Sequence, residues 1–212
     1  MTREPDSQPA LWRRRRARPL LIGVALVASL TILVLAVGSS NDSEVDRLAD
    51  LLQVREGMKV AEIGAGSGWL TVEIATRVGA SGRVFSTELS ERRLDQIRDA
   101  VADAGLSNVT VVQAGERSAN LPAGCCDAVF MRRVYHHLTD ASAILLDLRD
   151  ALAGGGRLVI IEFEAGGLLG MVSREGIDQA PLIAEVTASG FDLVSVGEWP
   201  GWGHYVAVFQ KP

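Results

Sequence analysis

The chain has 212 residues, of which 48% are hydrophobic and 22% charged; this suffices for one medium-sized domain and excludes a disordered chain. Two cysteines cannot build a disulfide framework or a four-cysteine zinc site, and a net charge of −5 argues against general nucleic-acid binding. The charge is unevenly divided: residues 1–40 carry six arginines against two acidic residues, a net +4, whereas residues 41–212 carry a net −9.

The first predicted element is a membrane-spanning helix. Residues 20–37 contain no charged side chain, and at about 1.5 Å per residue they would form a helix of about 27 Å, close to the ~30 Å hydrocarbon core. We therefore predict a basic cytoplasmic tail at residues 1–19 and a transmembrane anchor or uncleaved signal at residues 20–38. A cleaved signal peptide is the alternative, because Ala36 and Gly38 would suit a cleavage site. A buried core helix is a second alternative.

From residue 42 to the C-terminus, segments with helical spacing alternate with short β-branched runs, which predicts an α/β domain over residues 42–212. Because the strands are strongly apolar, we expect a mostly parallel sheet with helices on both faces. The last two strands are joined only by residues 197–203, too short for a crossover helix, and should pair antiparallel. Helices are predicted from residue 42 to about 56 and at 69–78, 90–104, 140–152 and 177–189, and strands at 60–63, 83–87, 109–113, 127–131, 157–163, 191–196 and 204–210.

A glycine-rich turn follows the first predicted strand. Gly64, Gly66 and Gly68 leave no Cβ between the backbone and a ligand, and a helix N-terminus with free N–H groups comes next. Trp69 stands where a dinucleotide fingerprint would have its last glycine, and no Gly-Lys-Ser/Thr follows, which disfavours both a dinucleotide site and a P-loop. A purely structural strand-to-helix turn is the alternative.

An acidic residue, Glu88, ends the second predicted strand, where a carboxylate can accept hydrogen bonds from both ribose hydroxyls. Together with the glycine turn, it predicts a nucleoside ligand whose remainder is not a pyrophosphate. The alternative is that Glu88 only caps the helix that follows Ser90.

At this point the chain resembles the class I S-adenosylmethionine-dependent methyltransferases. The motifs that carry the resemblance are VAEIGAGSGWLTVEIA at residues 60–75, VFSTELS at 84–90, CCDAVFMRRVYHHL at 125–138 and LRDALAGGGRLVIIEF at 148–163. The resemblance implies a Rossmann-like seven-stranded sheet in the order 3-2-1-4-5-7-6, with strand 7 antiparallel. It also implies S-adenosyl-L-methionine as the cofactor.

The family's cofactor contacts map onto this chain residue by residue. Its glycine loop, which holds the methionine part, corresponds to Glu62, Gly64, Ala65, Gly66 and Gly68, although Glu62 replaces the commoner aspartate. Its ribose acid corresponds to Glu88, followed by Leu89, and its adenine carboxylate to the pair Gly115-Glu116, where the family usually has Gly-Asp. We count Arg132 as a further cofactor-binding residue.

Candidate catalytic residues follow the fourth predicted strand, where open α/β sheets place ligands. His136 could remove a proton from an acceptor, and Tyr135 is a second candidate; capping or packing at the start of the next helix is the alternative for His136 and His137. Arg132 and Arg133 could clamp an anionic acceptor or lipid headgroup, or pair with surface carboxylates.

Two remaining features narrow the chemistry. Cys125 and Cys126 would allow thiolate chemistry of the arsenic-methyltransferase type, but adjacent cysteines at a strand start are more often packing residues. We find no metal-ligand spacing and expect no metal.

The sequence thus predicts a membrane-associated enzyme that methylates a small-molecule or amphipathic acceptor, such as a lipid or quinone, by in-line transfer. The alternatives are a catalytically silent methyltransferase-fold binding protein and a dinucleotide oxidoreductase. The positive-inside rule places the domain on the non-cytoplasmic side, whereas supply of the cofactor favours the cytoplasmic side. We expect no nucleic-acid partner, and the sequence does not set the oligomeric state.

Overall fold

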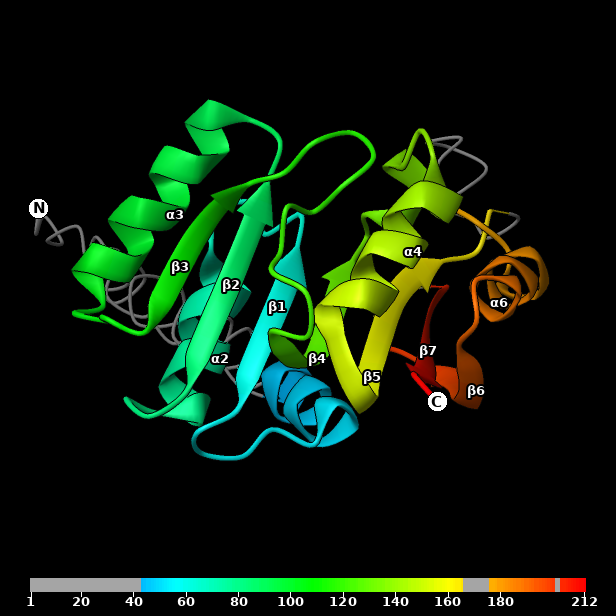
Figure 1. Ribbon diagram of the computed structural model, residues 1–212, viewed down its shortest axis with the longest axis horizontal. Coiled ribbons are helices and arrows are strands. Elements are labelled where there is room, and N and C mark those ends of the chain that lie inside the picture. The colour runs from blue at the N-terminus through cyan, green and yellow to red at the C-terminus, as the bar shows by residue number, and fades with distance from the viewer. Residues whose placement is uncertain (1–42, 166–175, 201–202) are drawn as a thin grey trace, which may run out of the picture. The chain divides into compact units, whose positions relative to one another are not determined.

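The computed structural model describes residues 43–165, 176–200 and 203–212, which contain a seven-stranded sheet in the order β3-β2-β1-β4-β5-β7-β6 (Figure 1). Neighbouring strands from β3 to β5 pair parallel, and β7 pairs antiparallel with both β5 and β6. The predicted Rossmann-like fold and strand order are therefore confirmed. The strands are β1 (Lys59–Ile63), β2 (Arg83–Glu88), β3 (Val109–Gln113), β4 (Cys126–Arg132), β5 (Leu152–Phe163), β6 (Asp192–Glu198) and β7 (His204–Gln210).

The predicted helices are present with small changes at their ends. A first helix covers residues 43–52. It is followed by α2 (Trp69–Val78), α3 (Glu91–Asp103), α4 (Ala141–Ala151) and α6 (Gln179–Ala188). A short 3₁₀ turn, η1 (Tyr135–His137), was not predicted, because three residues carry no periodic pattern.

The sheet is buried on both faces, because successive side chains of a strand point to opposite sides. In β4, Val129 and Met131 pack with α4 and α6, whereas Ala128 and Phe130 pack with the first helix and α2 on the other face. This is why the strands read as continuous apolar runs rather than as alternating ones.

One strand boundary differs clearly from the prediction. We expected the α4 helix to run to residue 152 and the next strand to begin at Arg157, but β5 already begins at Leu152. Leu152 pairs with Cys126, and after a register shift Arg157 pairs with Ala128. The intervening glycines, Gly154 to Gly156, lie in this irregular stretch, so a segment that looks like a loop extends the strand.

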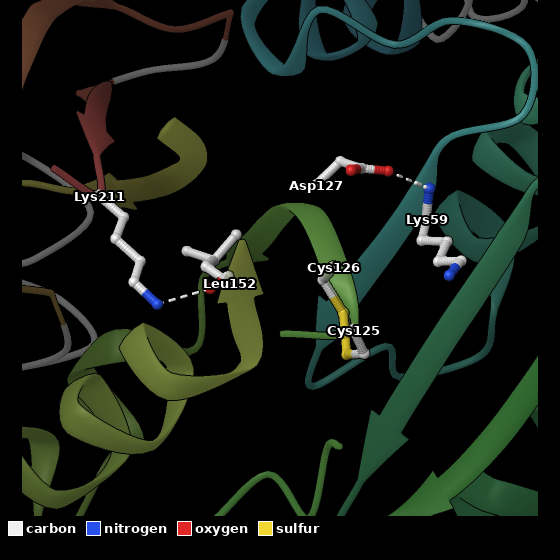
Figure 2. The surroundings of a disulfide bond; sticks show 6 residues. All are labelled: Lys59, Cys125, Cys126, Asp127, Leu152 and Lys211. Atoms are coloured by element: carbon white, nitrogen blue, oxygen red, sulfur yellow. Dashed lines mark hydrogen bonds between the residues drawn. A yellow bond between two sulfur atoms is a disulfide. The ribbon is translucent and has the colours of Figure 1, made fainter. Parts of the chain in front are cut away.

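Cys125 and Cys126 are joined in a disulfide, whereas the sequence had suggested ordinary packing residues (Figure 2). The pair lies at the start of β4, next to the hydrogen bond from the Lys59 N–H to Asp127 Oδ2 at 2.8 Å. Cofactor chemistry in this fold occurs at the opposite edge, where the strands end. The thiolate reading therefore finds no support in the position of the pair.

The predicted basic tail, residues 1–19, and the predicted anchor, residues 20–38, lie outside the described residues. Within residues 43–165, 176–200 and 203–212, no helix is both long and apolar enough to cross a membrane.

Candidate functional site

The main cavity lies at the carboxyl ends of the central strands and has a volume of about 670 Å³. This volume is within the range of ~300–1,000 Å³ that is typical of small-molecule sites. The cavity is lined by the glycine turn after β1, the start of α2, Arg93 of α3, the end of β4 with the turn that follows it, the end of β5 and the start of β7. The lining residues are Glu62, Gly64, Ala65, Gly66, Ser67, Trp69, Leu70, Arg93, Arg132, Arg133, His136, His137, Phe163 and His204.

The three glycines of the turn have different local roles. All three have positive φ, at 67° for Gly64, 60° for Gly66 and 83° for Gly68, a conformation that side-chain-bearing residues rarely adopt. A Cβ on Gly64 would lie 2.5 Å from Val134 Cγ2, and one on Gly68 would lie 3.1 Å from Ile97 Cα. A Cβ on Gly66 would meet nothing within 4 Å, so of the three only Gly66 borders open space, and it lines the cavity.

Glu88 is tied to this turn. Its Oε2 accepts a hydrogen bond from the Gly66 N–H at 3.2 Å, and its Oε1 accepts one from the Leu89 N–H at 3.0 Å. The Ala114 N–H donates to the Glu88 carbonyl at 2.9 Å, which brings the segment after β3 against the end of β2. In that segment, the Gly115 N–H donates to the Ser118 carbonyl at 2.7 Å and forms a turn.

Glu62 is a buried carboxyl that lines the cavity. Its carboxyl accepts a hydrogen bond from the Thr71 hydroxyl, and that hydroxyl also contacts Ser86 Oγ at 2.7 Å. Burial raises the pKa of Glu62 to about 8, because the hydrogen bond from Thr71 and the charge of Arg132 only partly offset the cost of a buried charge. An isolated Glu62 therefore keeps its proton at neutral pH, and a cationic ligand would favour its ionised form.

The turn after β4 separates its two candidate catalytic residues. His136 lines the cavity, and its Nδ1 lies 2.8 Å from Oε2 of the fully buried Glu162 on β5. Tyr135 is buried but does not line the cavity, and its hydroxyl donates to Glu185 Oε2 on α6 at 2.7 Å. Burial, and then the contact with Glu185, raise the pKa of Tyr135, so its phenol stays protonated. The structure thus brings His136 to the cavity and directs Tyr135 elsewhere.

The two arginines after β4 also differ. Arg132 Nε donates to Glu44 Oε1 at 2.5 Å, and the same oxygen accepts the Trp199 indole N–H at 3.1 Å. Among the described residues, no side chain forms a hydrogen bond or ion pair with the Arg133 guanidinium, which is exposed at the cavity. Arg133 also has a positive φ of 55°, a strained conformation for this residue type.

The structure therefore brings about half of the predicted site residues to the cavity itself: Glu62, Gly64, Ala65, Gly66, Arg132 and His136. Three others do not line it: Gly68 is the N-cap of α2, Glu88 contacts the turn through the Gly66 N–H, and Leu89 is 55% exposed. Gly115 and Glu116 follow β3 and do not line the cavity.

Sequence reasoning missed Glu162, Glu44 and His204. Glu162 was detectable only as a single acid inside the apolar run of β5, and Glu44 and His204 carry no local signal because their partners or neighbours are remote in sequence. No group of histidine, cysteine or acidic side chains in the described part of the chain is arranged to hold a metal ion.

The architecture, with a glycine turn at the cavity, is the fold of the class I S-adenosylmethionine-dependent methyltransferases. A methyltransferase from Aquifex aeolicus has the same fold, with a TM-score of 0.73 and 21% identity over 80% of this chain and 90% of that one. The cyclase SpnF is also similar, with a TM-score of 0.70 and 15% identity over 81% of each chain. At these identities the likeness establishes the fold alone.

Residues 60–156 match the family model described as a methyltransferase domain. The chain is also 34% identical over 115 residues to the ubiquinone/menaquinone biosynthesis C-methyltransferase UbiE of Idiomarina loihiensis, covering 54% of this chain and 46% of that one. The UbiE protein of Bordetella parapertussis is 36% identical over 110 residues, or 52% and 42% of the two chains.

These matches support the predicted enzyme class and cofactor: residues 60–156 match a methyltransferase domain, and the chain shares the fold of S-adenosylmethionine-dependent methyltransferases. The chain spans just under half the length of the curated relatives it matches, so their activity is not transferred to it by the match alone.

Proposed function

We propose that this chain transfers a methyl group from S-adenosylmethionine to a small amphipathic acceptor of the quinol type. The proposal that the methyl donor is S-adenosylmethionine rests on the open space above Gly66, beside the carboxylates of Glu62 and Glu88. Glu62 suits the donor's cationic methionine end, the N-terminus of α2 suits its carboxylate, and Glu88 suits its ribose. When bound, the donor supplies an activated methyl group, and the protein's task is to orient the reactants and exclude water.

The acceptor half rests on two observations. The curated relatives are named for C-methylation in ubiquinone and menaquinone biosynthesis, which supports an aromatic, membrane-soluble acceptor. Arg133 adds an exposed guanidinium at the cavity, with no side-chain partner among the described residues; this is suited to an oxygen that carries negative charge.

Calorimetry on the full-length chain with S-adenosylmethionine tests the donor half. We expect saturable binding, with competition by S-adenosylhomocysteine, and the absence of binding at millimolar donor would refute the enzyme. The fold alone does not decide this, because the cyclase SpnF has the same fold. Binding without turnover of any quinol, phenol or lipid acceptor would favour the alternative of a catalytically silent binding protein.

We also propose that residues 20–38 anchor the protein in a membrane as a single helix. The support is the uncharged stretch at residues 20–37 that follows five arginines. Extraction of membranes with alkaline carbonate should leave the full-length chain in the pellet. A mature N-terminus after residue 38, measured by mass spectrometry, would instead establish a cleaved signal peptide.

A further inference from the structure

The strongest unexplained arrangement in the cavity is the pairing of His136 with a buried acid. Glu162 is completely buried on β5, and its carboxyl accepts the backbone N–H groups of His136 at 3.3 Å and Phe163 at 3.2 Å. Its Oε2 also lies 2.8 Å from Nδ1 of the His136 ring, and the tautomer of the ring decides which of the two donates. An ionised Glu162 can only accept a hydrogen bond from the ring, because a carboxylate has no proton to donate. Beside that partner, a neutral imidazole carries its proton on Nδ1.

The other ring nitrogen, Nε2, is buried. His136 has a side chain that is only 7% exposed, and among the described residues its buried Nε2 has no hydrogen-bond partner. A buried nitrogen without a partner is costly unless a ligand supplies one. Since His136 lines the cavity, the missing partner is expected there.

The ring is also fixed in orientation. It packs against His137, with ring centroids 3.9 Å apart, and edge-on against Phe163 at 5.1 Å. General-base catalysis often uses a base whose orientation is fixed by a further group. Here Glu162 contacts one side of the His136 ring, and His137 and Phe163 pack against it.

We infer that His136 is the general base of methyl transfer and that Glu162 is its positioning residue, so the acceptor carries an ionisable hydroxyl that loses its proton during the reaction. This inference rests on the proposed function. The hydroxyl proton goes to His136 Nε2, and an electron pair of the acceptor's oxygen, or of the ring carbon conjugated to it, forms the bond to the methyl carbon. The methyl–sulfur bond breaks with its electron pair kept by sulfur. Where a ring carbon is methylated, its hydrogen leaves as a proton to solvent, and the phenolate oxygen takes back the proton held by His136.

Imidazole tautomers give a test that needs no acceptor. The chain contains only three histidines, so ¹⁵N-histidine labelling of the full-length protein in detergent gives three ring systems, which single substitutions assign. In the neutral ring of His136 we expect the proton on Nδ1, and we expect Glu162→Gln to change that tautomer population. A proton on Nε2 in the unmodified protein would overturn the assignment of His136 as base.

Turnover gives the second test, with a prenylated naphthohydroquinone and its dimethyl ether as probes. His136→Gln should lose roughly 10²–10⁴-fold in rate while keeping its donor affinity, and the ether should not react. Glu162→Asp should retain more activity than Glu162→Gln. The matched control for the glutamate variants is Glu185→Gln, whose carboxyl accepts the Tyr135 hydroxyl away from the cavity and which should keep most of the rate.

The pH profile separates a base from a merely structural histidine. The deficit of His136→Gln should shrink as the pH approaches the ionisation of a phenol, near 10, because the hydroquinone then loses its proton without a base. A deficit that stays constant with pH would overturn the base assignment. The other titratable or charged groups around His136 are Glu162, His137, Glu62, Arg132, Arg133 and His204, so each profile is compared with that of His137→Gln.

The two proposals fail in distinguishable ways. Loss of donor binding in the unmodified protein would refute the proposed methyltransferase, whatever the tautomer of His136. Donor binding combined with methylation of the dimethyl ether, or with no reaction of the hydroquinone, would refute the acceptor class and leave the methyltransferase standing.

Discussion

The Gly66 N–H donates a hydrogen bond to Glu88 Oε2 at 3.2 Å, although 22 residues separate the two in sequence. The bond joins the turn after β1 to the end of β2, so the open space at Gly66 and the carboxylate proposed to hold the ribose lie at a fixed separation. A donor that spans both points would meet a preformed site.

Glu88→Gln should weaken donor binding by about tenfold to a hundredfold. The amide keeps the shape of the side chain but loses the charge, and hydrogen bonds to a charged group are worth roughly 1.5–3 kcal/mol. Calorimetry with S-adenosylmethionine measures the effect. The control is Glu91→Gln at the start of α3, where the carboxylate only pairs with the exposed Arg98 at 3.3 Å. Equal affinities of the two variants would contradict the ribose assignment.

Two alanine substitutions in the glycine turn should affect different properties, one mainly donor affinity and the other mainly stability. Gly66→Ala places a methyl group in open space, so the protein should fold, at a cost of roughly 1–2 kcal/mol for the positive φ, and lose donor affinity. Gly64→Ala adds a clash with Val134 Cγ2 at 2.5 Å and should lower the free energy of unfolding further.

Thermal unfolding and calorimetry on both variants separate these effects. Val134→Ala should restore part of the stability of Gly64→Ala and none of the donor affinity of Gly66→Ala. Unchanged donor binding by Gly66→Ala would show that the cavity at this turn is not the donor site.

The fold was largely predictable from the sequence, because apolar strands, helical spacing and glycine turns are local signals. The antiparallel end of the sheet followed from the short connection between the last two strands, and that prediction is confirmed by the pairing of β6 with β7. The start of β5 was not predictable, because Gly154 to Gly156 carry a loop signal and only the pairing with β4 makes them part of a strand.

The site was predictable where one segment supplies it and not where several elements meet. His136 and the glycine turn each lie within one motif. Glu162 can be recognised as a site residue only from its contact with the His136 ring, 26 residues earlier in the sequence. Glu44 can be recognised only from its contact with Arg132, 88 residues later. Tyr135 was predicted to be catalytic because it precedes His136 in the sequence. In the structure, its hydroxyl donates to Glu185 and does not reach the cavity.

Donor binding should release a proton below pH 8. Burial raises the pKa of Glu62 to about 8, and the positive charges of a bound donor would favour the ionised carboxylate. Donor affinity should therefore increase with pH up to about 8 and then level off. Calorimetry in two buffers with different heats of ionisation measures the proton release, which Glu62→Gln should abolish. Equal apparent enthalpies in the two buffers for the unmodified protein would contradict this prediction.

The Glu62 carboxyl should also make the free energy of unfolding depend on pH. Its pKa in the folded protein, about 8, is higher than the ordinary 4.5, so between these values the folded protein holds a proton that the unfolded chain has released. The contribution of Glu62 to the free energy of unfolding is therefore present below pH 4.5 and declines as the pH rises to about 8. Denaturant unfolding at several pH values should show this decline in the unmodified protein and its loss in Glu62→Gln.

Glu44 should couple the first helix to the cavity. Its Oε1 accepts from both Arg132 and the buried Trp199, so Glu44→Ala leaves two donors without a partner and should cost roughly 1–3 kcal/mol. Donor affinity should also fall, since Arg132 lines the cavity. Asp46→Ala is the matched control in the same helix, because its ion pair with Arg77 is exposed and should contribute at most about 1 kcal/mol. A Glu44 variant with the stability and donor affinity of the Asp46 variant would refute the coupling.

The disulfide between Cys125 and Cys126 should report the side of the membrane on which the domain lies. The arginines before residue 20 favour a non-cytoplasmic domain, and disulfides persist in such oxidising compartments but are reduced in the cytosol. Alkylation of intact cells with a mass-tagged maleimide, followed by denaturation, should therefore leave the chain unmodified until a reductant is added, after which it should gain two tags.

Replacing the five arginines at positions 13–16 and 18 with glutamine should weaken the orientation and yield a fraction that is tagged without reductant. Two tags on the unmodified chain before reduction would instead place the domain in the cytoplasm, the side on which the donor is made.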